Sequence, residues 1–264
     1  MIVAGIDAGS RALKIALVDR DTGELVASAT VDQTIAQCQL AQQVLDATLA
    51  KHGHTRGDIV RTIATGYGRN LITFADGTIT EITCHARGVR QVFPSVRTIV
   101  EIGGQDSKVI RLGPNGHVED FAMNDRCAAG TGRFLELVGD RLNTKLLQLG
   151  EMALHSQGTT AISSMCAVFA ETEIIGLLAS GTPTPDIAAG VQNAIARRMA
   201  ALAGRKVVAP VVFTGGVALV PGMDQALGQA LGERVTVAPT PQMTGALGAA
   251  LLGREQLNGS PGRT

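Results

Sequence analysis

The chain has few aromatic residues and no excess of charge of either sign. Its 264 residues include no Trp, one Tyr and six Phe, and 23 Lys and Arg balance 23 Asp and Glu. Scarce aromatic side chains leave little surface for stacking nucleic-acid bases. A net charge of zero gives no basic field that would attract nucleic acid or an anionic membrane. We therefore expect no nucleic-acid partner and no membrane partner.

Long apolar runs and paired cysteines are also absent. No run approaches the roughly 18 apolar residues that a membrane-spanning helix needs, and the N-terminal segment lacks the basic and long apolar regions of a secretion signal. We expect a cytoplasmic protein whose four cysteines form no structural disulfides. The absence of any Cys-x-x-Cys pair argues against thioredoxin chemistry and ordinary zinc ribbons. Glycine, in contrast, is abundant, with 32 residues, which favours tight turns and close backbone approaches.

The same succession of predicted elements opens twice along the chain. Alternating apolar residues predict three strands and then a helix near the N-terminus, at 2–7, 14–19, 25–30 and 35–51. Three further strands are predicted at 98–102, 108–112 and 118–123, with helices at 130–142, 166–180 and 185–204 and a buried strand from 211. Such an internal duplication predicts two similar α/β domains that face a cleft. We expect residues 1–94 plus 245–264 to form the first domain and 95–244 the second.

Glycine turns at the ends of predicted strands give the first chemical signal. They stand at Asp7-Ala8-Gly9-Ser10, Gly103-Gly104-Gln105-Asp106 and Thr214-Gly215-Gly216. Glycine lets backbone N–H groups approach phosphate oxygens closely. Asp7 and Asp106, one in each half, are candidates to hold Mg²⁺ through water and to orient a hydrolytic water, with Lys14 near a phosphate. A single turn of this kind is commonly a capped hairpin, but three of them at strand ends favour a phosphate site.

Two familiar nucleotide-binding motifs are missing. The chain contains neither Gly-x-x-x-x-Gly-Lys-Ser/Thr nor a strand-linked Gly-x-Gly-x-x-Gly. The segment from Ala129 to Arg133 only superficially resembles a phosphate-binding loop, because Arg133 replaces the Lys-Ser/Thr end. A Walker-type or Rossmann-type site is therefore excluded.

The second chemical signal is the placement of two cysteines. Cys127 stands just before one predicted helix and Cys166 at the start of another, where the helix dipole and free N–H groups stabilise a thiolate. Such positions suit a redox thiol or a ligand of an anionic metal centre, although two buried free thiols remain an equally simple interpretation. An iron–sulfur cubane needs four ligands. A twofold dimer in which each chain supplies two cysteines to one cluster would satisfy that number.

Six segments, in order along nearly the whole chain, carry a resemblance to a known family. They are Asp7-Ala8-Gly9-Ser10, Ala64-Thr65-Gly66-Tyr67-Gly68-Arg69-Asn70, Ile102-Gly103-Gly104-Gln105-Asp106-Ser107-Lys108, Asn124-Asp125-Arg126-Cys127-Ala128-Ala129-Gly130-Thr131-Gly132-Arg133-Phe134, Thr214-Gly215-Gly216-Val217-Ala218 and Gly245-Ala246-Leu247-Gly248-Ala249-Ala250. Together they resemble the activator component of 2-hydroxyacyl-CoA dehydratases, of the BadF/BadG/BcrA/BcrD-type ATPase family. The match is specific because segments that carry cysteines alternate along the chain with segments that resemble the phosphate-binding turns of an actin/hexokinase/DnaK-type ATPase.

The resemblance implies a fold, cofactors and partners. The fold is α/β, with two duplicated RNase H-like domains around a nucleotide cleft that binds ATP or ADP with Mg²⁺. Proteins of this family are oxygen-sensitive homodimers with one 4Fe–4S cluster, shared between the chains and held by the cysteines matching Cys127 and Cys166. ATP hydrolysis drives one low-potential electron into the dehydratase component, and ferredoxin or flavodoxin recharges the activator.

The resemblance also assigns roles to individual residues. Catalytic roles fall to Asp7, Gln105 and Asp106. Nucleotide-binding roles fall to Gly9, Ser10, Lys14, Gly103, Gly104, Thr214, Gly215, Gly216, Val217 and Ala218. Glu101 and Arg11 depart from the family pattern, which has Asp and a small hydroxyl residue there, and Cys38 and Cys84 receive no role.

Two other functions remain open at this point. One is an ATP-binding subunit of a benzoyl-CoA reductase, which would need an unlike ATPase partner in place of a second copy. The other is a metabolite kinase of the same fold with buried cysteines, although the sequence has no obvious insertion for binding a phosphoryl acceptor.

His85, next to Cys84, is expected to be a structural histidine and not a metal ligand.

Overall fold

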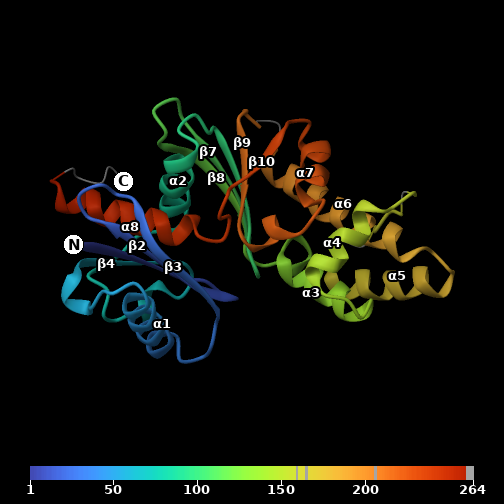
Figure 1. Ribbon diagram of the computed structural model, residues 1–264. Coiled ribbons are helices and arrows are strands. Elements are labelled where there is room, and N and C mark those ends of the chain that lie inside the picture. Colours follow the sequence, from blue (N-terminus) through green and yellow to red (C-terminus); the bar gives the residue numbers. More distant parts are fainter. Residues whose placement is uncertain (159, 164–165, 205–206, 260–264) are drawn as a thin grey trace. The chain divides into compact units, whose positions relative to one another are not determined.

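The structure is a computed structural model, and it describes residues 1–158, 160–163, 166–204 and 207–259. The chain forms two compact units. The first consists of Met1–Pro94 and the C-terminal segment from Gln242, and the second of Ser95–Pro241. Each unit is built on a five-stranded sheet, and Figure 1 shows the helices that accompany each sheet.

The first unit combines a mixed sheet with three α-helices. Its strands are β1 (Ile2–Ala8), β2 (Ala12–Asp19), β3 (Leu25–Asp32), β4 (Ile59–Thr65) and β5 (Gly77–Thr78), and its helices are α1 (Gln37–Lys51), α2 (Glu81–Val92) and α8 (Thr244–Leu257). The strand order is β3-β2-β1-β4-β5. The first three strands form an antiparallel meander, and β4 and β5 add in parallel.

Both faces of the first sheet are covered by helices, which explains the continuous apolar run in β1. Ile6 and its alternate neighbours pack on Leu45 of α1, whereas Val3 faces the other way, toward α8 (Figure 1). A strand buried on both faces reads as uniformly apolar. Gly5 is required in β1 because a Cβ there would overlap the backbone of α8 at Ala246 and Ala250.

The second unit repeats the sheet and adds more helices. Its strands are β6 (Thr98–Ile102), β7 (Ser107–Leu112), β8 (Val118–Asn124), β9 (Val211–Thr214) and β10 (Val235–Val237), and its helices are α3 (Gly132–Arg141), α4 (Leu146–Leu154), α5 (Ala167–Ala179), α6 (Thr184–Ala203) and α7 (Met223–Leu231). The strand order β10-β9-β6-β7-β8 is the same topology as in the first unit. The duplicated α/β architecture expected from the sequence is therefore confirmed.

Several elements carried no clear signal in the sequence. The strands and helices predicted around the two openings are present, but β4, β5, β10, α2, α4 and α7 were not predicted. Burial in such elements depends on contacts with segments remote in the sequence: Cys84 and His85 of α2, for example, are buried beside α8. Among the described residues, no helix combines the length and the hydropathy that crossing a bilayer requires.

Candidate functional site

In the first unit, a carboxylate and a lysine face each other where β1 ends. Asp7 and Lys14 are directly paired across β1 and β2, and Lys14 Nζ lies 3.1 Å from Asp7 Oδ2. Asp7 is only 4% exposed, so this ion pair compensates the charge of a buried carboxylate. The backbone of Gly66, at φ +87°, occupies the space beside Asp7 Oδ1, which a Cβ would fill. Only glycine adopts this conformation at no steric cost.

The turn after β1 brings further predicted residues to the same place. The Gly9 N–H donates to the Ala12 carbonyl at 3.2 Å, and Gln33 Nε2 donates to the Gly9 carbonyl at 2.9 Å. A Cβ on Gly9 would lie 2.8 Å from Lys14 Nζ. Asp7, Gly9 and Lys14 are thus in one small region, and Ser10 directly follows Gly9 in the turn.

Helices α2 and α8 place a histidine beside Asp7. His85 is buried, and its Nδ1 lies 2.9 Å from Thr244 Oγ1. Its ring and Asp7 Oδ2 both lie close to Gly245, where a Cβ would be 3.3 Å from the ring and 3.0 Å from the carboxylate. The adjacent Cys84 is fully buried, and this burial raises the pKa of its thiol to about 12. Cys84 is therefore a protonated, unreactive thiol at neutral pH.

In the second unit, a lysine binds two carboxylates at the end of β6. Lys108 is 1% exposed. Its Nζ lies 2.9 Å from Glu101 Oε2 and 2.7 Å from Asp106 Oδ2. A buried ammonium group between two carboxylates fixes the positions of all three side chains.

The two strand ends are equivalent in detail. Asp7 pairs with Lys14 and with Thr65, and Glu101 pairs with Lys108 and with Thr214. Each threonine is followed by a glycine of positive φ, Gly66 at +87° and Gly215 at +91°. The counterpart of Asp7 in the second sheet is therefore Glu101, and Asp106 lies on the loop beyond it. Sequence reasoning gave Glu101 and Lys108 no role, yet an acid followed seven residues later by lysine occurs at both places.

The glycine loop of the second unit is joined to the start of α3. The Gly132 N–H donates to the Gly103 carbonyl at 2.9 Å, and the Arg133 N–H donates to the Gly104 carbonyl at 2.8 Å. The loop also closes on itself, since the Gly103 N–H donates to the Asp106 carbonyl at 2.9 Å. Gln105, at the tip, is exposed. Because these hydrogen bonds join the loop to α3, a ligand that moved the loop would also displace the first turn of α3.

The turn after β9 lies close to the same loop. Thr214 Oγ1 donates to the Pro241 carbonyl at 2.5 Å, and the Gly215 N–H donates to the same oxygen at 2.9 Å. The following 3₁₀ turn, Gly216–Leu219, contains the buried Val217 and Ala218. A Cβ on Gly132 would lie 3.2 Å from Val217 Cγ2 and 3.0 Å from the Gly103 carbonyl oxygen. Gly132 thus packs between two of the predicted nucleotide-binding segments.

The two cysteines at helix starts are both exposed, which removes the buried-thiol interpretation. Cys127 has extended backbone and is clamped by Asn124, whose Oδ1 accepts from the Cys127 N–H at 3.1 Å and whose Nδ2 donates to its carbonyl at 2.8 Å. Cys166 is the N-cap residue of α5. Exposed thiols are suitable ligands for an iron–sulfur centre. The described part of the chain contains no group of three or more His, Cys, Asp or Glu side chains that could hold a metal ion.

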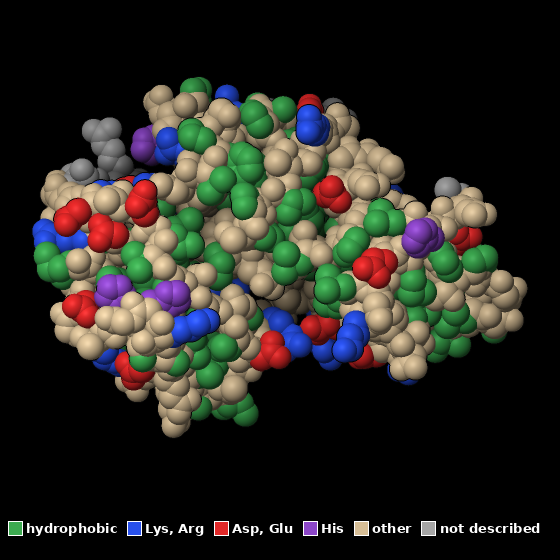
Figure 2. Space-filling model, in the orientation of Figure 1, with side chains coloured by type: hydrophobic (Ala, Val, Ile, Leu, Met, Phe, Trp, Pro, Cys, Tyr) green, Lys and Arg blue, Asp and Glu red, His purple; other side chains and the backbone are tan. Residues whose placement is uncertain are grey.

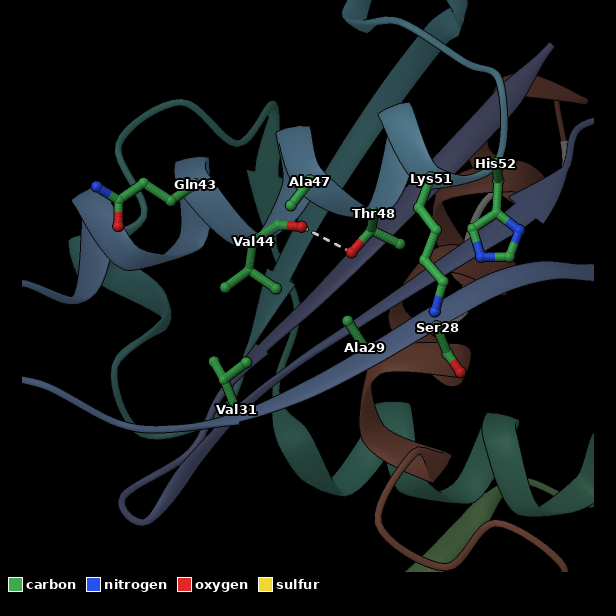
Figure 3. A pocket seen from close by; sticks show the side chains of 9 residues that line it. All are labelled: Ser28, Ala29, Val31, Gln43, Val44, Ala47, Thr48, Lys51 and His52. Carbon is green, nitrogen blue, oxygen red and sulfur yellow. Dashed lines mark hydrogen bonds between the residues drawn. The ribbon is translucent and has the colours of Figure 1, made fainter.

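A hollow elsewhere in the first unit does not involve these residues. It has a volume of about 400 Å³ and opens between β3 and α1 (Figure 3). Its lining consists of Ser28, Ala29, Val31, Gln43, Val44, Ala47, Thr48, Lys51 and His52. It contains no carboxylate and none of the glycine turns, so we do not assign the chemistry to it.

The duplicated sheets, each with a carboxylate, a lysine and a glycine turn at its strand end, have the actin/hexokinase fold. A glucokinase of the ROK family from Streptomyces griseus has the same fold, with a TM-score of 0.59 at 14% identity over 97% of this chain and 100% of that chain. The chain belongs to the BadF/BadG/BcrA/BcrD ATPase family, whose model matches residues 4–253.

More similar relatives are named as dehydratase activators. The activator of lactoyl-CoA dehydratase from Anaerotignum propionicum is 44% identical over 256 residues, which cover 97% of this chain and 98% of the relative. A solved structure of the activator of the 2-hydroxyisocaproyl-CoA dehydratase from Clostridium difficile, with bound ADPNP, has a TM-score of 0.92 at 40% identity. That alignment covers 98% of this chain and 97% of the other.

Proposed function

We propose that the chain is an ATP-dependent activator that passes one low-potential electron from a 4Fe–4S cluster to a 2-hydroxyacyl-CoA dehydratase. The names of its relatives support the dehydratase as the partner. The two exposed cysteines support the cluster. Ferredoxin or flavodoxin would supply the electron, because the chain has to be reduced again after each transfer.

The glycine turns would approach the phosphates of the nucleotide closely, because glycine has no side chain. These are the turns at Gly9 and at Gly103 and Gly104, whose shape is kept by the hydrogen bonds from the Gly9 and Gly103 N–H groups to the Ala12 and Asp106 carbonyls. Lys14 would add a positive charge. Carboxylates are the ligands that Mg²⁺ prefers, so Asp7 and Asp106 would hold it through water. Ser10 and Gln105 would complete the polar lining of the phosphates, with Gln105 orienting water. The turn at Thr214, Gly215, Gly216, Val217 and Ala218 would face the adenosine.

A shared cluster requires two copies of the chain. Cys127 and Cys166 give two ligands, and a second copy would provide the other two. Helix α5, which begins directly after Cys166, exposes large apolar side chains at Val168, Phe169 and Ile175. Hydrophobic side chains are visible over the end of the second unit that carries α4 and α5 (Figure 2). An exposed apolar surface next to the cysteines supports a homodimer contact there.

The observation that carries the proposal is the link between the phosphate loop and the segment that follows Cys127. The carbonyl groups of Gly103 and Gly104 accept hydrogen bonds from the first two residues of α3. When the loop adjusts to ATP or to ADP, α3 and the adjoining cysteine segment would shift with it. Hydrogen bonds and charge around a cluster set its potential, so nucleotide state would alter the driving force for electron transfer.

The test is a measurement of iron, acid-labile sulfide and native mass on protein purified without oxygen. We expect two irons and two sulfides per chain in a dimer, with EPR and absorption spectra of a 4Fe–4S centre. After reduction by ferredoxin or dithionite, ATP should be required to activate a 2-hydroxyacyl-CoA dehydratase. A colourless, iron-free monomer whose ATP turnover rises with a phosphoryl acceptor would instead indicate a metabolite kinase. Activity only with an unlike ATPase chain would indicate a benzoyl-CoA reductase subunit.

A further inference from the structure

Arg198, on α6, lies next to residues 124–130, which contain Cys127 and form the Cys127 segment. Arg198 Nη1 donates to the carbonyl of Ala129 at 3.1 Å, and Ala129 is two residues beyond Cys127. Burial lowers the pKa of the Arg198 guanidinium, but the group remains charged at every pH of interest.

The side chain of Arg198 lies beside Gly130 as well as Ala129. A Cβ on Gly130 would make an ordinary contact of 3.7 Å with Arg198 Cδ and a close one of 3.2 Å with Asn124 Nδ2. Asn124 is the residue that clamps the Cys127 backbone. Met199, which follows Arg198 along α6, is buried in the core of the second unit. The charge of Arg198 is thus fixed relative to the Cys127 segment.

Other arginines near the cysteines are placed differently. Arg126 is adjacent to Cys127 in the sequence, but its side chain is 96% exposed, so solvent screens its charge. Arg197 is also exposed, and its Nη2 donates to the Ile162 carbonyl at 3.3 Å. Arg198 alone among these three combines partial burial with a hydrogen bond to the Cys127 segment.

We propose that Arg198 is a positioning residue whose fixed positive charge raises the reduction potential of the cluster held by Cys127 and Cys166. This inference rests on the proposed function. A cluster gains one negative charge when it is reduced, and a fixed cation in a partly buried environment stabilises that charge. Arg198 therefore makes the cluster easier for the electron donor to reduce. It would act through its charge, and its hydrogen bond to Ala129 would set the position of that charge.

The experiment is an EPR-monitored redox titration of the cluster in the dimeric protein, in the wild type and in Arg198→Gln and Arg198→Lys. In Arg198→Gln, we expect the ratio of reduced to oxidised cluster at a fixed ambient potential to fall about tenfold, which is a shift of ~59 mV for a one-electron couple. Arg198→Lys keeps the charge and should stay close to the wild type. Arg234→Gln is the matched control. It removes the same charge from an exposed position just before β10, at the opposite edge of the sheet from β8 and Asn124, and should not shift the potential.

The outcomes separate this inference from the proposed function. Equal potentials in all four proteins, each with full iron content, would overturn the role of Arg198 and leave the proposed function intact. An equal fall in Arg198→Gln and Arg198→Lys would also overturn it, because the charge would then not be the cause. If Arg198→Gln binds no iron, Arg198→Met removes the same charge in its place: a tenfold fall is expected there too, and an unchanged potential would overturn the inference. A wild-type protein that binds no iron would refute the proposed function itself.

Discussion

The backbone N–H of Gly132 donates a hydrogen bond of 2.9 Å to the carbonyl of Gly103, which joins helix α3 to the glycine loop after β6. Gly132 also packs against Val217. One backbone position therefore contacts two of the segments expected to bind the nucleotide, and it lies five residues beyond Cys127. The contact joins the loop proposed to bind phosphate to the segment proposed to ligate the cluster, within one unit.

Gly132→Ala should weaken nucleotide binding and leave iron content unchanged. The added Cβ would lie 3.0 Å from the Gly103 carbonyl oxygen, so the loop has to move away. Overpacking of about 1–3 kcal/mol in the loop predicts an affinity loss of about 5- to 150-fold. Calorimetric titration with a nonhydrolysable ATP analogue measures the affinity of each variant. Gly57→Ala, where a Cβ makes only an ordinary contact at 3.5 Å, should bind as the wild type does, and equal affinities in the two variants would contradict the prediction.

Asp7→Asn should retain nucleotide binding and slow hydrolysis. The substitution keeps the shape of the side chain beside Lys14 and Gly66, but it removes the carboxylate that would hold Mg²⁺-bound water. Loss of such a group lowers turnover by about 100-fold or more. ATP turnover and nucleotide affinity are measured side by side, with Asp19→Asn at the other end of β2 as the control. Unchanged turnover would remove Asp7 from the site.

Lys108→Met should destabilise the second unit strongly. Lys108 is the buried partner of Glu101 and Asp106, so its loss leaves buried negative charge uncompensated, which costs about 3–5 kcal/mol. Combining it with Glu101→Gln should recover part of that loss, since the buried carboxylate is then neutral. Urea unfolding measures both variants. Lys51→Met, at the exposed end of α1, should change stability by less than about 0.5 kcal/mol.

Cys166→Ala should abolish the cluster and leave a folded chain that binds nucleotide. The thiol is exposed at the start of α5, so its removal creates no cavity in the core. Iron analysis and nucleotide titration of protein prepared without oxygen measure the two properties. Cys38→Ala, which replaces a half-buried cysteine with no assigned role, should keep its iron. Full iron content in Cys166→Ala would refute the ligand assignment.

Alkaline pH should destabilise the first unit through Cys84. Burial raises the pKa of this thiol from 9.0 to about 12 in the folded protein, so only the unfolded chain ionises between these values. The stabilising contribution of the protonated thiol is complete below pH 9 and is lost as the pH rises toward 12, with a slope of up to about 1.4 kcal/mol per pH unit. Urea unfolding at pH 8 and pH 10 should show this decline, and Cys84→Ala should show less of it. Equal pH dependence in both proteins would exclude Cys84 as the cause.

Much of the architecture, with the position of the glycine turns, follows from the sequence. The alternation of apolar residues located the strands on either side of Asp7 and Gly103, and the repeat of strand, turn and strand indicated the duplication, because these patterns are local. The glycine turns were recognisable for the same reason. Helix α2 was not predicted, since the burial of Cys84 and His85 depends on contact with α8, which is remote in sequence.

Tertiary structure alone decided which charged groups meet. Glu101 became the counterpart of Asp7 through strand register, since both face a lysine on the neighbouring strand and a threonine on the other side. Arg198 contacts Ala129, in the Cys127 segment, only because α6 packs on the core of the second unit. Local spacing fixes which elements form and where turns expose backbone N–H groups. Electrostatic partners depend on distances between segments far apart in the chain, and those distances exist only once the sheets and helices have packed.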